Sequence, residues 1–128
     1  MKIFENDAET LSLMVVGTFE TGVPPKVQTS ELLMMFNARS KKQRYRIEPQ
    51  LTIRADGEVI RTRQMKNYGS REEAGGLILE PLLTMTPYDV LAKMAAAKTV
   101  TIEIGTAKYE LSSNSLEALR DVAKRMVQ

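Results

Sequence analysis

The last third of the chain, TPYDVLAKMAAAKTVTIEIGTAKYELSSNSLEALRDVAKRMVQ (residues 86–128), decides the fold class. It predicts a helix, a tight β-hairpin and a second helix in succession. Thr86 is expected to be the N-cap of the first helix, because a proline follows it and proline favours the first helical position. The apolar stripe predicts that this helix ends near residue 97 or 98. A serine or asparagine among residues 112–114 is expected to cap the second helix.

The hairpin between these helices has a well-defined predicted register. Residues 100–104 alternate apolar and polar side chains, which is typical of a strand with one buried face. Gly105-Thr106 suits a two-residue type II′ turn, since glycine at the first central position tolerates positive φ. With this turn, Ile102 faces Tyr109 and Glu103 faces Lys108. The pairs match apolar with apolar and acid with base, which supports the register.

A second hairpin is predicted around Asp56-Gly57, because these two residues tolerate the positive φ angles of a type I′ turn. A regular ladder from this turn opposes Ile53 to Ile60 and Thr52 to Arg61. The side chains of one sheet face in this register are polar or basic, apart from Val59. They are Gln50, Thr52, Arg54, Arg61 and Arg63.

The rest of the chain reads as strands and loops. Residues 11–19 alternate as a strand, and the glycine and prolines of residues 21–25 indicate a loop. The apolar run 32–36 (Leu-Leu-Met-Met-Phe) predicts a strand covered on both faces, with one turn of buried helix as the alternative. Residues 67–76 read as the longest loop. Residues 77–83 contain Pro81, so they are expected to form an edge strand or an irregular bridge.

Together these elements predict one α+β domain over residues 1–128. Its mostly antiparallel sheet has five to seven strands, and the two helices near the C-terminus pack on it. No apolar run is long enough to span a bilayer. Residues 1–7 lack the features of a signal peptide. The chain is therefore expected to be cytoplasmic if Met1 is native, or exported if a signal peptide was removed.

The composition limits the catalytic and metal-binding chemistry that the chain can support. The chain has no histidine and no cysteine, which excludes disulfides, thiolate zinc sites and the usual nucleophilic triads. We therefore predict no catalytic residue, no metal site and no cofactor. The alternative of a small carboxylate- or lysine-dependent enzyme depends on Glu72 and Glu73, with Ser70 and Tyr68 nearby in a glycine-rich loop. A solvated loop is the simpler interpretation of this segment.

Positive charge is concentrated in the middle of the chain. Residues 39–71 hold ten basic side chains against three acidic ones, although the whole chain has a net charge of only +2. Arg54, Arg61, Arg63 and Lys66 are the candidate contacts to a polyanion or nucleic acid. No aromatic residue alternates with these arginines, so a stacking platform for bases is missing. A solvated sheet face is the alternative interpretation.

The apolar run also supplies a candidate interface. Leu32, Met34 and Phe36 are expected to join a second copy of the chain if one side of their sheet is left uncovered. The eight methionines are otherwise explained as core filling. The favoured hypothesis is a non-catalytic binding or assembly module that self-associates. Polyanion binding and the small enzyme remain the two alternatives.

Three short elements of the C-terminal unit carry a resemblance. They are Ile104-Gly105, Tyr109-Glu110-Leu111-Ser112 and Ala118-Leu119-Arg120. They are similar to the turn, strand end and helix centre of a loose class of uncharacterised bacterial small domains, which often look exported. The resemblance implies a β-rich body ahead of this unit and a mature exported domain. It implies no activity, and no functional residue carries over from it.

Overall fold

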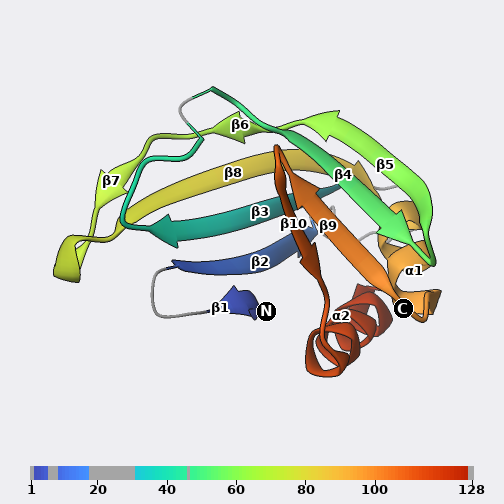
Figure 1. Ribbon diagram of the computed structural model, residues 1–128. Helices are drawn as coiled ribbons and strands as arrows, with labels where there is room; N and C mark the ends of the chain where they lie inside the picture. The colour runs from blue at the N-terminus through green and yellow to red at the C-terminus, as the bar shows by residue number, and fades with distance from the viewer. Residues whose placement is uncertain (1, 6–8, 18–30, 46, 127–128) are drawn as a thin grey trace, which may run out of the picture.

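The computed structural model describes residues 2–5, 9–17, 31–45 and 47–126 (Figure 1). Within these ranges the chain forms two antiparallel sheets, two α-helices and a short 3₁₀ turn, η2 (Ala74–Gly76). The first sheet consists of β1 (Lys2–Glu5), β2 (Glu9–Gly17), β3 (Glu31–Ser40), β6 (Lys66–Asn67), β7 (Arg71–Glu72) and β8 (Ile78–Pro87). The second consists of β4 (Gln50–Ala55), β5 (Glu58–Gln64), β9 (Val100–Ile104) and β10 (Ala107–Glu110). The helices are α1 (Tyr88–Ala96) and α2 (Ser113–Met126).

The predicted α+β class with two C-terminal helices is confirmed, and its strands divide between two sheets. The first sheet has the order β1-β2-β3-β8-β6, with β7 also paired to β8. The second has the order β10-β9-β4-β5 and crosses over the first (Figure 1). The chain passes from the second sheet to the first between β5 and β6, at the buried Met65. No described helix is both long and apolar enough to cross a bilayer.

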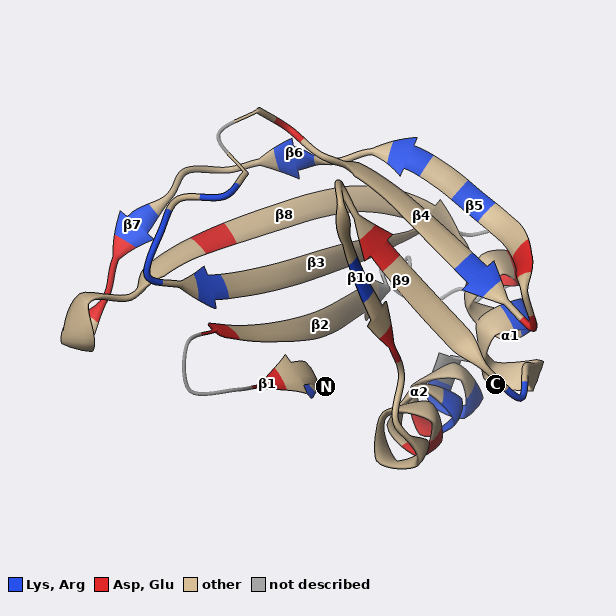
Figure 2. Cartoon of the chain, viewed as in Figure 1, with Lys and Arg blue, Asp and Glu red and all other residues tan. Residues whose placement is uncertain are grey.

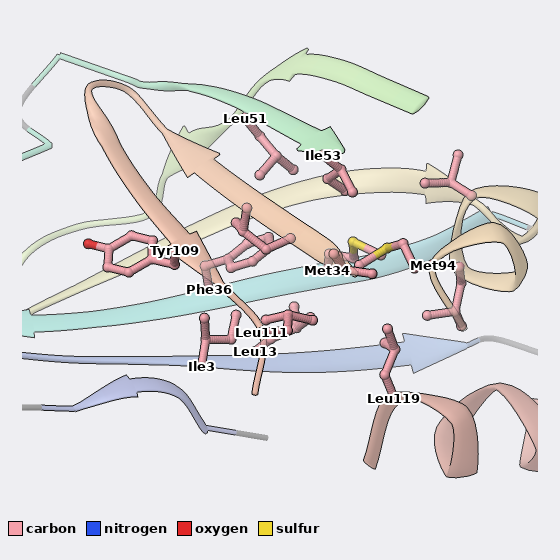
Figure 3. Close-up of a cluster of buried hydrophobic side chains, with 14 of the residues drawn as sticks. Ile3, Leu13, Met34, Phe36, Leu51, Ile53, Met94, Tyr109, Leu111 and Leu119 are labelled. Atoms are coloured by element: carbon pink, nitrogen blue, oxygen red, sulfur yellow. The ribbon is translucent and has the colours of Figure 1, made fainter. Parts of the chain in front are cut away.

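The core lies between the two sheets, where their inner faces meet (Figure 3). Leu13, Met34 and Phe36 come from the first sheet, and Leu51 and Ile53 come from the second. These side chains have at most 2% of their surface exposed. Burial of apolar surface on this scale is the main force that holds two sheets together.

The two helices lie side by side and contribute to the same core. Leu91 and Met94 of α1 and Leu119 of α2 are completely buried. The Tyr88 hydroxyl donates a hydrogen bond to the carbonyl of Ala123, at 3.2 Å, which joins the two helices directly. The helices therefore extend the core beyond the sheets.

The predicted register of the C-terminal hairpin is confirmed. Tyr109 pairs with Ile102 and Lys108 pairs with Glu103. Gly105 has a φ of 60°, as the first central position of a type II′ turn requires. Ser112 caps α2, because its hydroxyl accepts a hydrogen bond from the backbone N–H of Ser115 at 3.2 Å.

The predicted N-cap of the first helix is wrong. Strand β8 continues through Thr86, which pairs with Leu32, so α1 begins at Tyr88 with Pro87 as its N-cap. The Thr86 side chain is completely buried, and its hydroxyl finds no partner in the part of the chain that the structure describes. Pairing with β3 keeps Thr86 in strand β8, although the local sequence around it indicates the start of a helix.

The Asp56-Gly57 turn is confirmed, but the ladder that follows it contains a bulge. Asp56 and Gly57 have φ angles of 51° and 85°, as a type I′ turn requires. Arg54 pairs with Val59 as predicted, whereas Ile53 pairs with Arg61 and not with Ile60. One extra residue in β5 moves every later side chain of this strand to the face opposite the one that a regular ladder predicts.

The apolar run 32–36 forms a strand, as predicted, within β3. Alternate residues of β3 are buried, and those between them are only partly covered. The prediction of a strand buried on both faces is therefore wrong for the outer face. Proline has no backbone N–H to donate to a neighbouring strand. Pro81 is tolerated in β8 because its nitrogen points away from β3, to the side on which its carbonyl accepts a hydrogen bond from the N–H of Tyr68. On that side the neighbours of β8 are interrupted between β6 and β7.

A buried carboxylate fixes the segment that leaves β3. Glu80 of β8 is completely buried, and its carboxylate accepts hydrogen bonds from the backbone N–H groups of Arg44 (2.8 Å) and Tyr45 (2.9 Å). The side chains of Asn67 and Ser70 donate to it at 3.5 Å. Glu80 thus joins the connection between β3 and β4 to β8 and to residues 67–70.

Candidate functional site

The outer face of the first sheet carries an apolar surface built from three neighbouring strands. Cross-strand pairing places Val16, Leu33 and Met85 in one row and Met14, Met35 and Leu83 in the next. We call these six side chains the methionine face. Met14 has 52% of its surface exposed, and Val16 and Met85 each have 40%. The face is apolar, because none of the six side chains is charged. It is accessible to water, because three of them are at least 40% exposed.

The interface residues predicted from the sequence belong to the opposite side of β3. Leu32, Met34 and Phe36 have no exposed surface and belong to the core. Figure 3 shows Met34 and Phe36 within it. A run of five consecutive apolar residues does not say which alternate set faces the core. Within the run 32–36, the side chains that point to the outer face are those of Leu33 and Met35.

Four members of the methionine face were missed by the sequence analysis. Met14 and Val16 lie in a strand whose apolar run also continues through Val15, so its two faces were not distinguished. Leu83 and Met85 lie beyond Pro81, in a stretch assigned to an edge strand or helix start. The signal that could have found Met85 is its position between two threonines at the strand period of two.

The structure separates the four candidate anion contacts into two groups. Arg54 forms an ion pair with Glu103 of β9, at 3.1 Å. The bulge in β5 places Arg61 and Arg63 opposite Ile53 and Leu51, so they do not share a face with Arg54. The prediction of one continuous basic sheet face is wrong for this reason. Retention on heparin remains the measurement for the polyanion hypothesis.

Three of the four candidates gather instead where β5 passes into β6, at the edge of the methionine face. Figure 2 shows basic residues on both of these strands. Arg63 and Lys66 line a surface hollow of about 280 Å³. The guanidinium of Arg61 donates a hydrogen bond from Nη2 to the carbonyl of Met85, at 2.9 Å. Leu33, Leu83 and Met85 also line the hollow, as does Tyr68, which is 67% exposed. We call this place the basic hollow.

The acidic loop of the enzyme hypothesis does not assemble a carboxylate pair. Glu73 forms an ion pair with Arg39 of β3, at 2.6 Å, whereas Glu72 lies exposed in β7. Tyr68 lines the basic hollow. Over the residues described, no group of three acidic, histidine or cysteine side chains could hold a metal ion.

Tyr45 is unusual because it is a buried tyrosine. Tyr45 has 5% of its surface exposed, and its hydroxyl lacks a hydrogen-bond partner among the residues placed in the structure. Burial raises the pKa of Tyr45 well above its ordinary value of 10.0, and the neighbouring Tyr109 adds to this effect. The hydroxyl is therefore held protonated in the folded chain, and we assign it no chemical role.

Replacing Tyr45 with phenylalanine is expected to leave the stability at neutral pH within about 1 kcal/mol of wild type, because no hydrogen bond is lost. Above pH 10 the unfolded tyrosine ionises while the folded one stays protonated. Its contribution to stability therefore falls as the pH rises, by at most about 1.4 kcal/mol per pH unit. Urea unfolding at pH 7 and above pH 10 measures both effects. A Y45F variant that loses stability as steeply as wild type in alkali would contradict this account.

Comparisons with known proteins gave no match, whether to family models, to curated proteins or to solved structures.

Proposed function

We propose that this protein is a non-catalytic assembly module that binds a second copy of itself through the methionine face. The observation that carries the proposal is the pair of apolar rows across β2, β3 and β8, which remain accessible to water. Contiguous apolar surface of this kind is a typical mark of an interaction site. Val59, in contrast, is an exposed apolar residue with an arginine opposite it in the ladder.

The chemistry of the face favours a second copy as the partner. In a two-fold symmetric dimer the same patch contacts itself, so the patch must be compatible with its own chemistry. The six side chains of the methionine face meet this condition, because none of them carries a charge. Methionine is unbranched and flexible, so Met14, Met35 and Met85 can interdigitate with their copies without a preformed fit.

Sedimentation equilibrium over a wide range of protein concentrations tests the proposal. The wild-type chain is expected to show a reversible monomer–dimer equilibrium. Met14→Glu places a charge in the proposed interface and is expected to weaken the association by at least about tenfold, or about 1.4 kcal/mol. Val59→Glu is the matched control on the second sheet and is expected to leave the association unchanged.

Three results would contradict the proposal. The first is a wild-type chain that stays monomeric at every concentration. The second is a dimer that M14E leaves intact, since the interface would then lie on another surface. The third is equal weakening by M14E and V59E, because the effect would then follow added charge in general.

A further inference from the structure

The basic hollow combines an apolar floor with unpaired positive charge. Leu33 of β3 and Leu83 and Met85 of β8 supply the floor, and Arg63 and Lys66 stand at the side where β5 passes into β6. Both cations are exposed, and neither has an ion-pair partner within the described ranges. Two other arginines of the sheets are neutralised by ion pairs, Arg39 with Glu73 and Arg54 with Glu103.

A third basic side chain holds the edge of the hollow in place. Arg61 donates from Nη2 to the carbonyl of Met85, and its Nε–H is buried without a partner in the described part of the chain. A guanidinium held by one backbone carbonyl keeps its positive charge uncompensated. The charge of Arg61 therefore adds to that of Arg63, which lies two residues further along the same strand.

We propose that the basic hollow binds a small anionic amphiphile, a molecule with one carboxylate attached to an apolar chain. The volume of about 280 Å³ is close to the lower limit of small-molecule sites, roughly 300 Å³, and so suits a short chain. The apolar tail would lie on Leu33, Leu83 and Met85. The carboxylate would accept hydrogen bonds from Arg63 and Lys66, which are charge-assisted and therefore stronger than neutral ones. The aromatic ring of Tyr68 would cover part of the tail.

This inference does not require self-association. The hollow shares three side chains with the methionine face, but Met14 is not among its lining residues. The M14E variant therefore provides a chain with a weakened proposed interface and an unchanged hollow. Binding measured on this variant separates the two proposals, because either can fail while the other holds.

Isothermal titration calorimetry with three probes of equal tail length provides the test. They are octanoate, octanol and octylammonium, titrated into the wild-type chain and into M14E. Octanoate is expected to bind both chains at least tenfold more tightly than octanol, and octylammonium is expected to bind more weakly than octanol. The double substitution Arg63→Gln and Lys66→Gln is expected to reduce octanoate binding to the level of octanol. Arg54→Gln removes a positive charge on another face and serves as the control.

The expected preference also depends on salt, because the two cations are exposed. Octanoate affinity is expected to fall as sodium chloride is raised, whereas octanol affinity should stay nearly constant. Equal affinity for octanoate and octanol would overturn the proposal. So would a double variant that binds octanoate as wild type does, or an Arg54→Gln variant that loses binding to the same extent.

Discussion

Replacing Glu80 with alanine is expected to lower the free energy of unfolding by about 3–5 kcal/mol. Its carboxylate is completely buried and accepts hydrogen bonds from the backbone N–H groups of Arg44 and Tyr45. Alanine leaves these two donors without their acceptor, and each buried donor left unpaired costs about 1–3 kcal/mol. The side-chain donors of Asn67 and Ser70 lose the same acceptor. The connection between β3 and β4 would then lose its main attachment to β8.

Urea unfolding followed by circular dichroism measures this change. Glu72→Ala is the matched control, because Glu72 is an exposed glutamate in the same sheet. It is expected to change the stability by no more than about 0.5 kcal/mol. Glu80→Gln keeps one carbonyl oxygen as an acceptor and is expected to fall between the two. A loss of less than about 1 kcal/mol in E80A would show that the segment is held by other contacts.

Adjacent methionines of β3 are expected to respond oppositely to the same substitution. Met34 is completely buried between the sheets, whereas Met35 lies on the methionine face. Met34→Lys buries an ammonium group without a partner, which costs several kcal/mol and is expected to prevent folding, since small domains have only about 5–15 kcal/mol of stability. Met35→Lys leaves the ammonium in water. It is expected to keep the fold and to weaken association by at least about tenfold.

Thermal unfolding and sedimentation of the two variants test this pair. M34K is expected to show no cooperative transition, and M35K is expected to melt within a few degrees of wild type. A folded M34K, or an unfolded M35K, would mean that the faces of β3 are assigned the wrong way round. The proposed interface would then lose its structural basis.

The C-terminal unit was predictable because several local signals agree there. The Gly105-Thr106 turn, the pairing of Ile102 with Tyr109 and the serine cap of α2 all have the predicted form. Each depends on residues close together in the sequence, where turn chemistry and side-chain period determine structure directly. The same holds for Asp56-Gly57, whose turn has the predicted backbone geometry.

Features that depend on distant parts of the chain were not predictable in this way. The bulge at Ile60 lies in an edge strand, where few buried side chains fix the register, so the regular ladder assumed from the turn was wrong. The extension of β8 to Pro87 depends on its pairing with β3, more than fifty residues earlier in the chain. No sequence pattern indicates that Glu80 is a buried hydrogen-bond acceptor, because the N–H groups that donate to it belong to a distant segment that only the fold brings near.

The sequence indicated the right segments for the candidate site but not the sheet faces on which their side chains lie. The apolar run in β3 was recognised, but the solvent-facing residues are Leu33 and Met35, since the sequence alone does not orient a strand that is apolar on both faces. The basic residues of β5 and β6 were also recognised. The bulge turns Arg61 and Arg63 away from Arg54 and toward the edge of β8, where Arg61 bonds to the carbonyl of Met85 and Arg63 lines the same hollow as Lys66.

The central claim is that the methionine face contacts a second copy of the chain, and methionine methyl groups report on it directly. Met14, Met35 and Met85 lie on this face, whereas Met34, Met65 and Met94 are completely buried and serve as internal references. The measurement is a dilution series of the wild-type chain, labelled with ¹³C at the methionine methyls and followed by NMR. We expect the signals of the three outer methyls to shift with concentration while the three core signals stay fixed. Outer signals that do not move over the whole series, or core signals that move with them, would contradict the claim.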